Sequence, residues 1–384
     1  MIYYGKQSVS QDDIDAVVAV LKSDLITQGP VATQFENAIS DYVGVKFSLA
    51  CSNGSAALHL ACLAVNVGEG DVVWTVPNTF VASANCALYC GAQVDFVDID
   101  ALTLNISIPE LSKKLAWAKE QNCLPKTLVV VHFAGNSCDM SAIKALSDEY
   151  GFFVIEDACH ALGSEFRDKK VGCCEFSDIS VFSFHPVKSI TCGEGGMLLS
   201  NNKTLIDKAR LLANNGITKD ETQFENQNEG QWYYEQVELG FNYRITDIQC
   251  ALGLSQLRRL DEFVASRHRI ASRYVKEFES LPLQLQQINL ECFSSFHLFT
   301  VTLKTECSLT KKQFFLLLEE KGIIANCHYI PVHLQPLYGK QFSSSKGFPV
   351  AEAYYRQSLS LPIYPSLTYE EQTKVIKAVK SCFA

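Results

Sequence analysis

The sequence predicts an α/β fold: a mainly parallel sheet flanked by helices, followed by a smaller α+β unit at the C-terminus. The chain has 384 residues, more than one hydrophobic core usually organises, and 47% of them are apolar against 20% charged. Short apolar runs alternate with helical stretches up to about residue 200, and this alternation ends after Asn242. We therefore expect a large domain over 1–250 and a small domain over 251–384.

The N-terminal part predicts two helices before the sheet. The first begins near Ser10, because acidic residues and then apolar residues at helical spacing follow it. The second, Thr33–Val43, is its expected partner. Buried strands are expected at Val72–Val76, Val94–Ile99, Leu128–Phe133, Phe152–Ile155, Ile179–Phe184 and Met197–Leu199. Helices are expected between them at Val81–Tyr89 and Ser141–Tyr150, and another at Ala56–Val65, after a strand that ends at Leu49–Cys51.

The C-terminal part begins with one long helical region from Ile245 to about Leu281, which we expect to link the two domains. Beyond it, strands are expected at His297–Leu303 and Ile323–Tyr329, and helices at Lys311–Lys321 and from Tyr369 to about Lys380. The polar segment Asn215–Trp232 predicts an exposed loop.

Composition narrows the class of protein. The net charge of −9 disfavours a nucleic acid partner, because the overall field would repel a polyanion. Neither a signal peptide nor an apolar run of about 20 residues is present, so we expect a cytoplasmic protein without a membrane span. The 15 cysteines are scattered and form no C-x-x-C pair, which predicts reduced thiols and no metal site.

The strongest chemical signal is Lys188, which follows the apolar strand Phe182–Phe184 and precedes the glycine-rich return Gly193–Gly196. Most lysines are solvated surface groups. An amine at the end of a buried strand is instead desolvated, which lowers its pKa and lets it form a Schiff base. We interpret His185 as a structural residue of the turn that shapes the approach of this lysine.

Two other strand ends complete a site. Asp157 ends the strand that begins at Val154, and the carboxyl ends of parallel strands meet in one crevice, although an aspartate there could also cap a helix. Asn53–Ser55 precedes a helix whose free amides suit a phosphate, although the same residues form ordinary turns. A Schiff-base lysine, a carboxylate for a pyridinium nitrogen and a phosphate cradle together predict pyridoxal 5'-phosphate (PLP).

Motifs along the chain carry a family resemblance. They are Asn53–Leu58, Pro77–Phe80, Glu156–Gly163, Ser183–Lys188, Gly193–Gly196 and Gly240–Arg244. Through them the chain resembles the DegT/DnrJ/EryC1/StrS sugar aminotransferases over nearly its whole length. The resemblance implies a PLP-dependent transferase of fold type I with a seven-stranded sheet. Many relatives have Ser-Gly-Thr where this chain has Asn53-Gly54-Ser55, but a hydroxyl and an amide remain for the phosphate.

A finer resemblance concerns the substrate. Leu25–Gly29, Trp232–Leu239 and His328–Pro331 are similar to one branch of the family. That branch moves an amino group from glutamate to carbon 4 of a UDP-linked 4-keto-6-deoxy N-acetyl hexosamine in pseudaminic acid biosynthesis. Another nucleotide-sugar 3- or 4-aminotransferase, UDP- or dTDP-linked, stays open as an alternative, as does a noncatalytic nucleotide-sugar binder.

The resemblance also implies roles for single residues. Lys188 and Asp157 would be catalytic, the former as Schiff base and proton shuttle and the latter as partner of the ring nitrogen. The remaining cofactor contacts would be Gly54, Ser55, Phe80, His160, Ser183 and, from a second subunit, Asn242. The sugar contacts would be Tyr4, Leu25, Ile26, Thr27, Cys327, His328, Tyr329 and Ile330. We therefore expect a homodimer with composite active sites.

Overall fold

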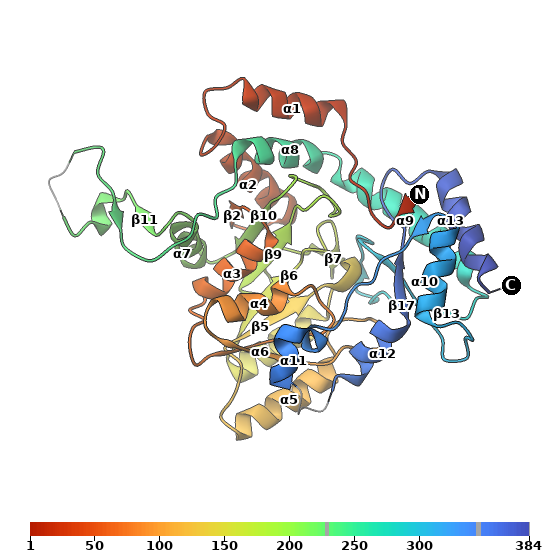
Figure 1. Cartoon of the computed structure of the whole chain (residues 1–384). Helices are drawn as coiled ribbons and strands as arrows, with labels where there is room; N and C mark the ends of the chain where they lie inside the picture. The colour runs from red at the N-terminus through yellow and green to blue at the C-terminus, as the bar shows by residue number, and fades with distance from the viewer. Residues whose placement is uncertain (227–229, 343–346, 384) are drawn as a thin grey trace.

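The computed structural model describes residues 1–226, 230–342 and 347–383. Its centre is a seven-stranded sheet in the order β2-β10-β9-β6-β5-β3-β4 (Figure 1). The strands are β2 (Phe47–Cys51), β3 (Val72–Thr75), β4 (Gln93–Phe96), β5 (Thr127–Val131), β6 (Phe153–Asp157), β9 (Ile179–Ser183) and β10 (Gly196–Ser200). β10 runs in the opposite direction to the other six strands of this sheet. The predicted α/β fold with a mainly parallel sheet is confirmed.

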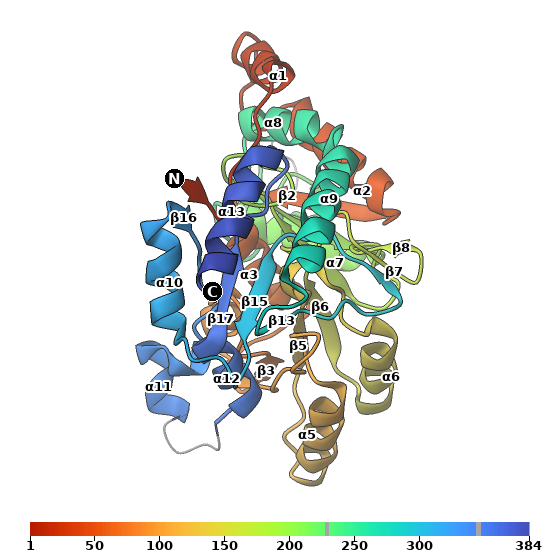
Figure 2. The same cartoon turned by 90° about the vertical axis from the view of Figure 1, so that its right-hand side faces the viewer.

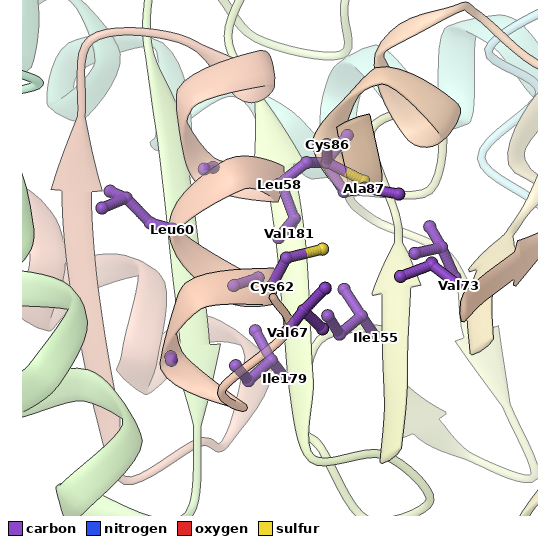
Figure 3. Packing of buried hydrophobic residues seen from close by; sticks show 14 of the residues in the cluster. Leu58, Leu60, Cys62, Val67, Val73, Cys86, Ala87, Ile155, Ile179 and Val181 are labelled. Atoms are coloured by element: carbon purple, nitrogen blue, oxygen red, sulfur yellow. The ribbon is translucent and has the colours of Figure 1, made fainter. Parts of the chain in front are cut away.

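Helices cover both faces of the central sheet, which explains why its inner strands are apolar on both sides. One face carries α3 (Gly54–Ala64), α4 (Ala82–Tyr89) and α7 (Lys203–Ala213), and the other carries α2 (Pro30–Val43), α5 (Ile108–Glu120), α6 (Met140–Tyr150) and α8 (Asp247–Leu257). Figure 3 shows the first core, where Leu58 and Cys62 of α3 pack over Ile155 and Val181. Val154, the neighbour of Ile155, packs on the opposite face, as strand geometry requires.

The two N-terminal helices form as expected, with one shifted boundary. α1 (Gln11–Leu21) begins after Ser10, whose hydroxyl and the Asp13 carboxylate form a capping box. α2 begins earlier than the predicted Thr33, because Gly29 is its N-cap and Pro30 occupies the first helical position. The carboxylate of Asp247 accepts the N–H groups of Gly29 and Val31, each at 3.0 Å.

The single long helix expected over Ile245–Leu281 is wrong. The structure has two helices, α8 and α9 (Leu260–Phe278), with a turn between them. A side chain just before this turn and one within it bond to Asp13 of α1: Gln256 Nε2 at 2.7 Å and Arg259 Nη2 at 2.6 Å. The turn thus serves a contact with a helix more than 240 residues away, which local sequence pattern cannot reveal.

The C-terminal part, whose strands and helices Figure 2 shows together, builds a separate core. Its antiparallel sheet has β13 (Leu283–Leu285), β15 (Phe299–Leu303) and β17 (Ser358–Leu361), and α9, α10 (Lys311–Glu320) and α13 (Tyr369–Ser381) pack with it. The N-terminal strand β1 (Ile2–Tyr3) pairs in parallel with β16 (Ile323–Ile324), so Ile2 belongs to this core. The domain boundary near residue 250 stays a prediction.

The strand expected over Ile323–Tyr329 is wrong beyond Ile324. β16 itself pairs with the two-residue β1, Asn326 then makes a single isolated bridge with Ser360 of β17, and the chain continues to the carboxyl edge of the central sheet. The short elements are β7 (Glu165–Phe166), β8 (Lys169–Lys170), β11 (Ile217–Thr218), β12 (Glu235–Gln236), β14 (Cys292–Phe293), α11 (Pro336–Phe342), α12 (Pro349–Gln357) and the 3-10 turns η1 (Phe133–Gly135), η2 (Glu221–Gln223) and η3 (Val332–Leu334).

The predicted loop Asn215–Trp232 lies in an arm that projects from the body beside α7 (Figure 1). Its residues 227–229 lie outside the described residues. β11 and β12 pair antiparallel in this arm, and Trp232 is 78% exposed.

Among the helices of the described residues, none combines the length and the apolar character needed to cross a membrane.

Candidate active site

A cavity of about 670 Å³ opens at the carboxyl edge of the central sheet. Most of the predicted site residues line it: Tyr4, Gly54, Ser55, Phe80, Asp157, His160, Ser183, Lys188, Cys327, His328 and Tyr329. They come from the segments that follow β2, β3, β6, β9 and β16 or end those strands, and from the N-terminus. Parallel strands bring their ends to one edge, so segments far apart in sequence meet here.

The other predicted contacts do not line this cavity. Asn242, Leu25, Ile26 and Ile330 are exposed, and Thr27 pairs with Thr246 in an isolated bridge. The structure therefore brings the cofactor residues of one chain together but leaves Asn242 and the Leu25–Thr27 loop on the surface. Which ligand atoms any of these residues touch stays a prediction.

Lys188 lies in the turn after β9, where its backbone N–H donates to the carbonyl of His185 at 2.9 Å. Burial lowers the pKa of its ammonium group, and the nearby acidic groups of Cys159 and Asp157 act in the opposite direction. A lowered pKa increases the share of neutral amine, which is the form that attacks a carbonyl carbon. His185, interpreted as structural, is exposed at the wall of the cavity, and its role stays a prediction.

Asp157 ends β6, which pairs in parallel with β9. Its Oδ2 accepts a hydrogen bond from Ser83 Oγ at 2.6 Å, and its Oδ1 accepts one from the N–H of Cys159 at 3.2 Å. The element that follows β6 is the strand β7, so Asp157 does not cap a helix. The carboxylate is thus held in place at the floor of the cavity and is available to a cationic group there.

The N-terminus of α3 supplies the donor-rich end of the cavity. Asn53 caps this helix by accepting the N–H of Ala56 at 2.8 Å, which leaves earlier N–H groups of the first turn without an intrahelical acceptor. A Cβ on Gly54 would lie 2.9 Å from the Cβ of Ser183, so glycine permits close packing of α3 against the end of β9. Free amides, the positive helix end and two serine hydroxyls suit a phosphate dianion.

His160 and Tyr329 form a hydrogen-bonded pair with a fixed direction. The N–H of Ala134 donates to His160 Nδ1 at 3.3 Å, and His160 Nε2 lies 3.0 Å from Tyr329 Oη. Burial and the nearby Lys188 lower the pKa of His160 well below its ordinary value, so the ring is neutral. Its one proton is therefore on Nε2 and donates to Tyr329, which leaves the tyrosine proton for an acceptor in the cavity.

Sequence reasoning missed other residues of this region. His297 lies beside His160 with ring centroids 4.4 Å apart, and Thr79, Cys159 and Asn326 also line the cavity. Ser83, which bonds to Asp157, lay inside a helix that the sequence predicted correctly. The sequence around His297 and Ser83 carries only the pattern of a strand and a helix, so no local signal pointed to either.

PLP fits the donor set of this cavity. Its phosphate suits the α3 end, its pyridinium nitrogen suits the carboxylate of Asp157, and its aldehyde carbon suits the desolvated amine of Lys188. Phe80, an aromatic residue that is 55% exposed within the cavity lining, offers a flat apolar face for the ring.

Comparison with known proteins agrees with this chemistry. The model of the DegT/DnrJ/EryC1/StrS aminotransferase family matches residues 7–380. The UDP-4-amino-4,6-dideoxy-N-acetyl-beta-L-altrosamine transaminase of Campylobacter jejuni is 38% identical over 373 residues, which are 97% of this chain and 94% of that protein.

Solved structures extend the comparison. PseC of Helicobacter pylori, an aminotransferase involved in the biosynthesis of pseudoaminic acid, superposes with a TM-score of 0.90 at 31% identity, covering 100% of this chain and 99% of that one. A sugar aminotransferase of Streptococcus pneumoniae in its PLP form has a TM-score of 0.87 at 25% identity, covering 98% and 97%. The chain belongs to the DegT/DnrJ/EryC1/StrS aminotransferase family and is a PLP-dependent sugar aminotransferase.

Proposed function

We propose that this enzyme transfers the amino group of glutamate to carbon 4 of a UDP-linked 4-keto-6-deoxy N-acetyl hexosamine, as a step of pseudaminic acid biosynthesis in the cytoplasm. The observation that carries the transaminase chemistry is the joint presence of Lys188, Asp157 and the α3 N-terminus in one cavity. The substrate assignment is supported by the likeness to the Campylobacter jejuni and Helicobacter pylori enzymes.

Five residues of the cavity then have defined tasks. Bound PLP supplies an electron sink and a temporary carrier for the amino group. Lys188 Nζ would hold the cofactor and, once displaced by a substrate amine, take the proton from the α-carbon of glutamate and later deliver one to carbon 4 of the sugar. Asp157 would keep the ring nitrogen protonated. Gly54, Ser55 and Ser183 would bind the phosphate.

The sugar contacts divide between two subunits in this proposal. Tyr4 and Cys327–Tyr329 would contact the sugar bound in their own cavity, which they line. The loop Leu25–Thr27 would join Asn242 in completing the cavity of a second copy. Two backbone contacts support this grouping: Asp247 N–H donates to the carbonyl of Ile26 at 3.0 Å, and Thr27 pairs with Thr246. The loop and the segment after Asn242 thus form one surface.

The test of the substrate is a panel of nucleotide-linked 3-keto and 4-keto sugars on UDP, dTDP and GDP, with glutamate as donor. The proposal expects the highest kcat/KM for a UDP-linked 4-keto-6-deoxy N-acetyl hexosamine and a 4-amino product. A clear preference for a 3-keto or dTDP-linked sugar would replace the substrate assignment. The half-reaction with glutamate alone, measured on the same preparation, is the control that separates a wrong sugar from an inactive enzyme.

A noncatalytic nucleotide-sugar binder would behave differently in the same experiment. It would bind the sugar but release no 2-oxoglutarate. Lys188 and Asp157, the groups that such a protein could lose without penalty, are both present and both line the cavity.

A further inference from the structure

The carboxylate of Asp157 is held by Ser83, a residue outside the sequence motifs through which the chain resembles its family. Ser83 Oγ donates to Asp157 Oδ2 at 2.6 Å, a short distance for a hydroxyl and a carboxylate. Ser83 lies in the first turn of α4 and is completely buried, with 0% of its surface exposed. Bulk water therefore cannot replace this donor if the hydroxyl is removed.

A second hydroxyl stands behind the first. Thr79 Oγ1 lies 2.7 Å from Ser83 Oγ, and Thr79 is 2% exposed. An ionised carboxylate only accepts hydrogen bonds, and Asp157 Oδ2 lies nearer to Ser83 Oγ (2.6 Å) than the Phe80 carbonyl does (3.3 Å), so the proton of Ser83 goes to Asp157. Thr79 then has to donate to Ser83. The chain Thr79 to Ser83 to Asp157 is polarised in one direction, and each bond strengthens the next.

The same short segment also contributes an aromatic residue to the cavity lining. Phe80, next to Thr79, lines the cavity, and its carbonyl lies 3.3 Å from Ser83 Oγ. The residues from Thr79 to Ser83 therefore fix the carboxylate for the ring nitrogen and the aromatic residue for the ring face. A displacement of the first turn of α4 would change both contacts together.

We propose that Ser83, supported by Thr79, is the positioning residue that orients the Asp157 carboxylate toward the ring nitrogen of the cofactor. This inference rests on the proposed role of Asp157. Ser83 itself touches neither cofactor nor substrate in this account. It acts because a carboxylate with one donor removed from Oδ2 is free to rotate, and its hydrogen bond to the ring nitrogen becomes longer and less linear.

The experiment compares Ser83→Ala with Ser180→Ala in the purified, PLP-reconstituted enzyme. Ser180 is an equally buried serine of β9 whose hydroxyl has no hydrogen-bond partner within the described part of the chain. We expect Ser83→Ala to weaken PLP binding by about 10-fold or more, in line with the loss of a hydrogen bond to a charged group. Ser180→Ala should bind PLP like the wild type.

The second readout is the pH titration of the bound chromophore. If the ring nitrogen holds its proton less firmly, the rest of the conjugated system becomes more basic. The midpoint pH of the chromophore titration should therefore rise in Ser83→Ala and stay unchanged in Ser180→Ala. Thr79→Val, which leaves Ser83 in place, should move the midpoint in the same direction by a smaller amount. Ser83→Cys, which keeps a weak donor, should lie between Ser83→Ala and the wild type.

The outcomes separate this inference from the proposed function. If Ser83→Ala folds and its PLP affinity and titration match those of Ser180→Ala while the wild type transaminates normally, the positioning role is wrong and the proposed function stands. If Ser83→Ala does not fold, the titrations of Thr79→Val and Ser83→Cys decide, and unchanged midpoints in both overturn the inference. A wild type without a chromophore would instead contradict the function.

Discussion

Lys188 and Asp157 follow neighbouring strands that pair in parallel, so their placement at one edge is a direct result of the chain's connectivity. Each lies at or just after the end of a buried, mainly apolar strand, and the sequence shows this transition plainly. Both residues were therefore predictable as site residues. Ser83 was not, because its contact with Asp157 joins residues 74 positions apart and its helix looks ordinary.

The role of Asp157 can be tested by a change that keeps its shape. Asp157→Asn should bind PLP more weakly than the wild type but still load at saturating cofactor, because the phosphate and Lys188 contacts remain, and it loses the negative charge that keeps the ring nitrogen protonated. We expect the half-reaction with glutamate to slow by ~10²-fold or more, the low end of what a positioned acid–base group contributes. Stopped-flow absorbance measures this rate. A near-normal rate would show that another group holds the proton.

At the scale of elements, apolar periodicity identified most strands of the central sheet and several of its helices, although α5 and α7 were not predicted. The prediction also failed where a distant side chain sets the boundary. The turn between α8 and α9 is the clearest case, since Asp13 of α1 accepts from Ser255, Gln256 and Arg259 around it. The end of β16 is another, because its pairing depends on a two-residue strand at the N-terminus. Neither partner can be inferred from neighbouring residues.

The Asp13 contacts predict a pH dependence of stability. Burial alone would raise the pKa of Asp13, but hydrogen bonds from Ser255, Ser10 and Gln256 and the charge of Arg259 lower it below 3.8. A lowered folded-state pKa stabilises the fold above the unfolded value and ceases to do so as pH falls through the folded value. The wild type should therefore lose Tm between about pH 5 and about pH 2 more steeply than Asp13→Asn.

The control for this measurement is Asp12→Asn, which removes an exposed carboxylate of the same helix turn. It should keep the wild-type slope of Tm against pH. Equal slopes for Asp13→Asn and the wild type would show that the carboxylate contributes no net stability in its ionised form. At neutral pH, Asp13→Asn should have the lower Tm, because it loses the charge that faces Arg259.

At the scale of the whole molecule, the sequence predicted a sheet covered by helices on both faces. Its apolar pattern did not predict which surface residues would contact a second copy of the chain. Apolar strands require helices on both faces, which determines the large sheet. Apolar periodicity cannot indicate whether an exposed residue such as Asn242 contributes to the active site of a second copy. Asn242 is exposed and lies outside the cavity of its own chain, which agrees with the proposed composite site.

Complementation tests the composite site. Lys188→Ala and Asn242→Ala subunits should each have little activity. After exchange, a mixed dimer has one cavity with both lesions and one with neither, so activity should return toward half of the wild-type value per mixed dimer. Native mass spectrometry confirms the exchange. If mixed dimers form and stay inactive, Asn242 acts within its own chain.

The central claim is that Lys188 carries the cofactor, and peptide mapping after borohydride reduction of the PLP-loaded enzyme tests it most directly. The account predicts a visible chromophore that reduction fixes to the peptide containing Lys188, with no label in Lys188→Ala. A label on another lysine, or no chromophore after incubation with PLP, would contradict it.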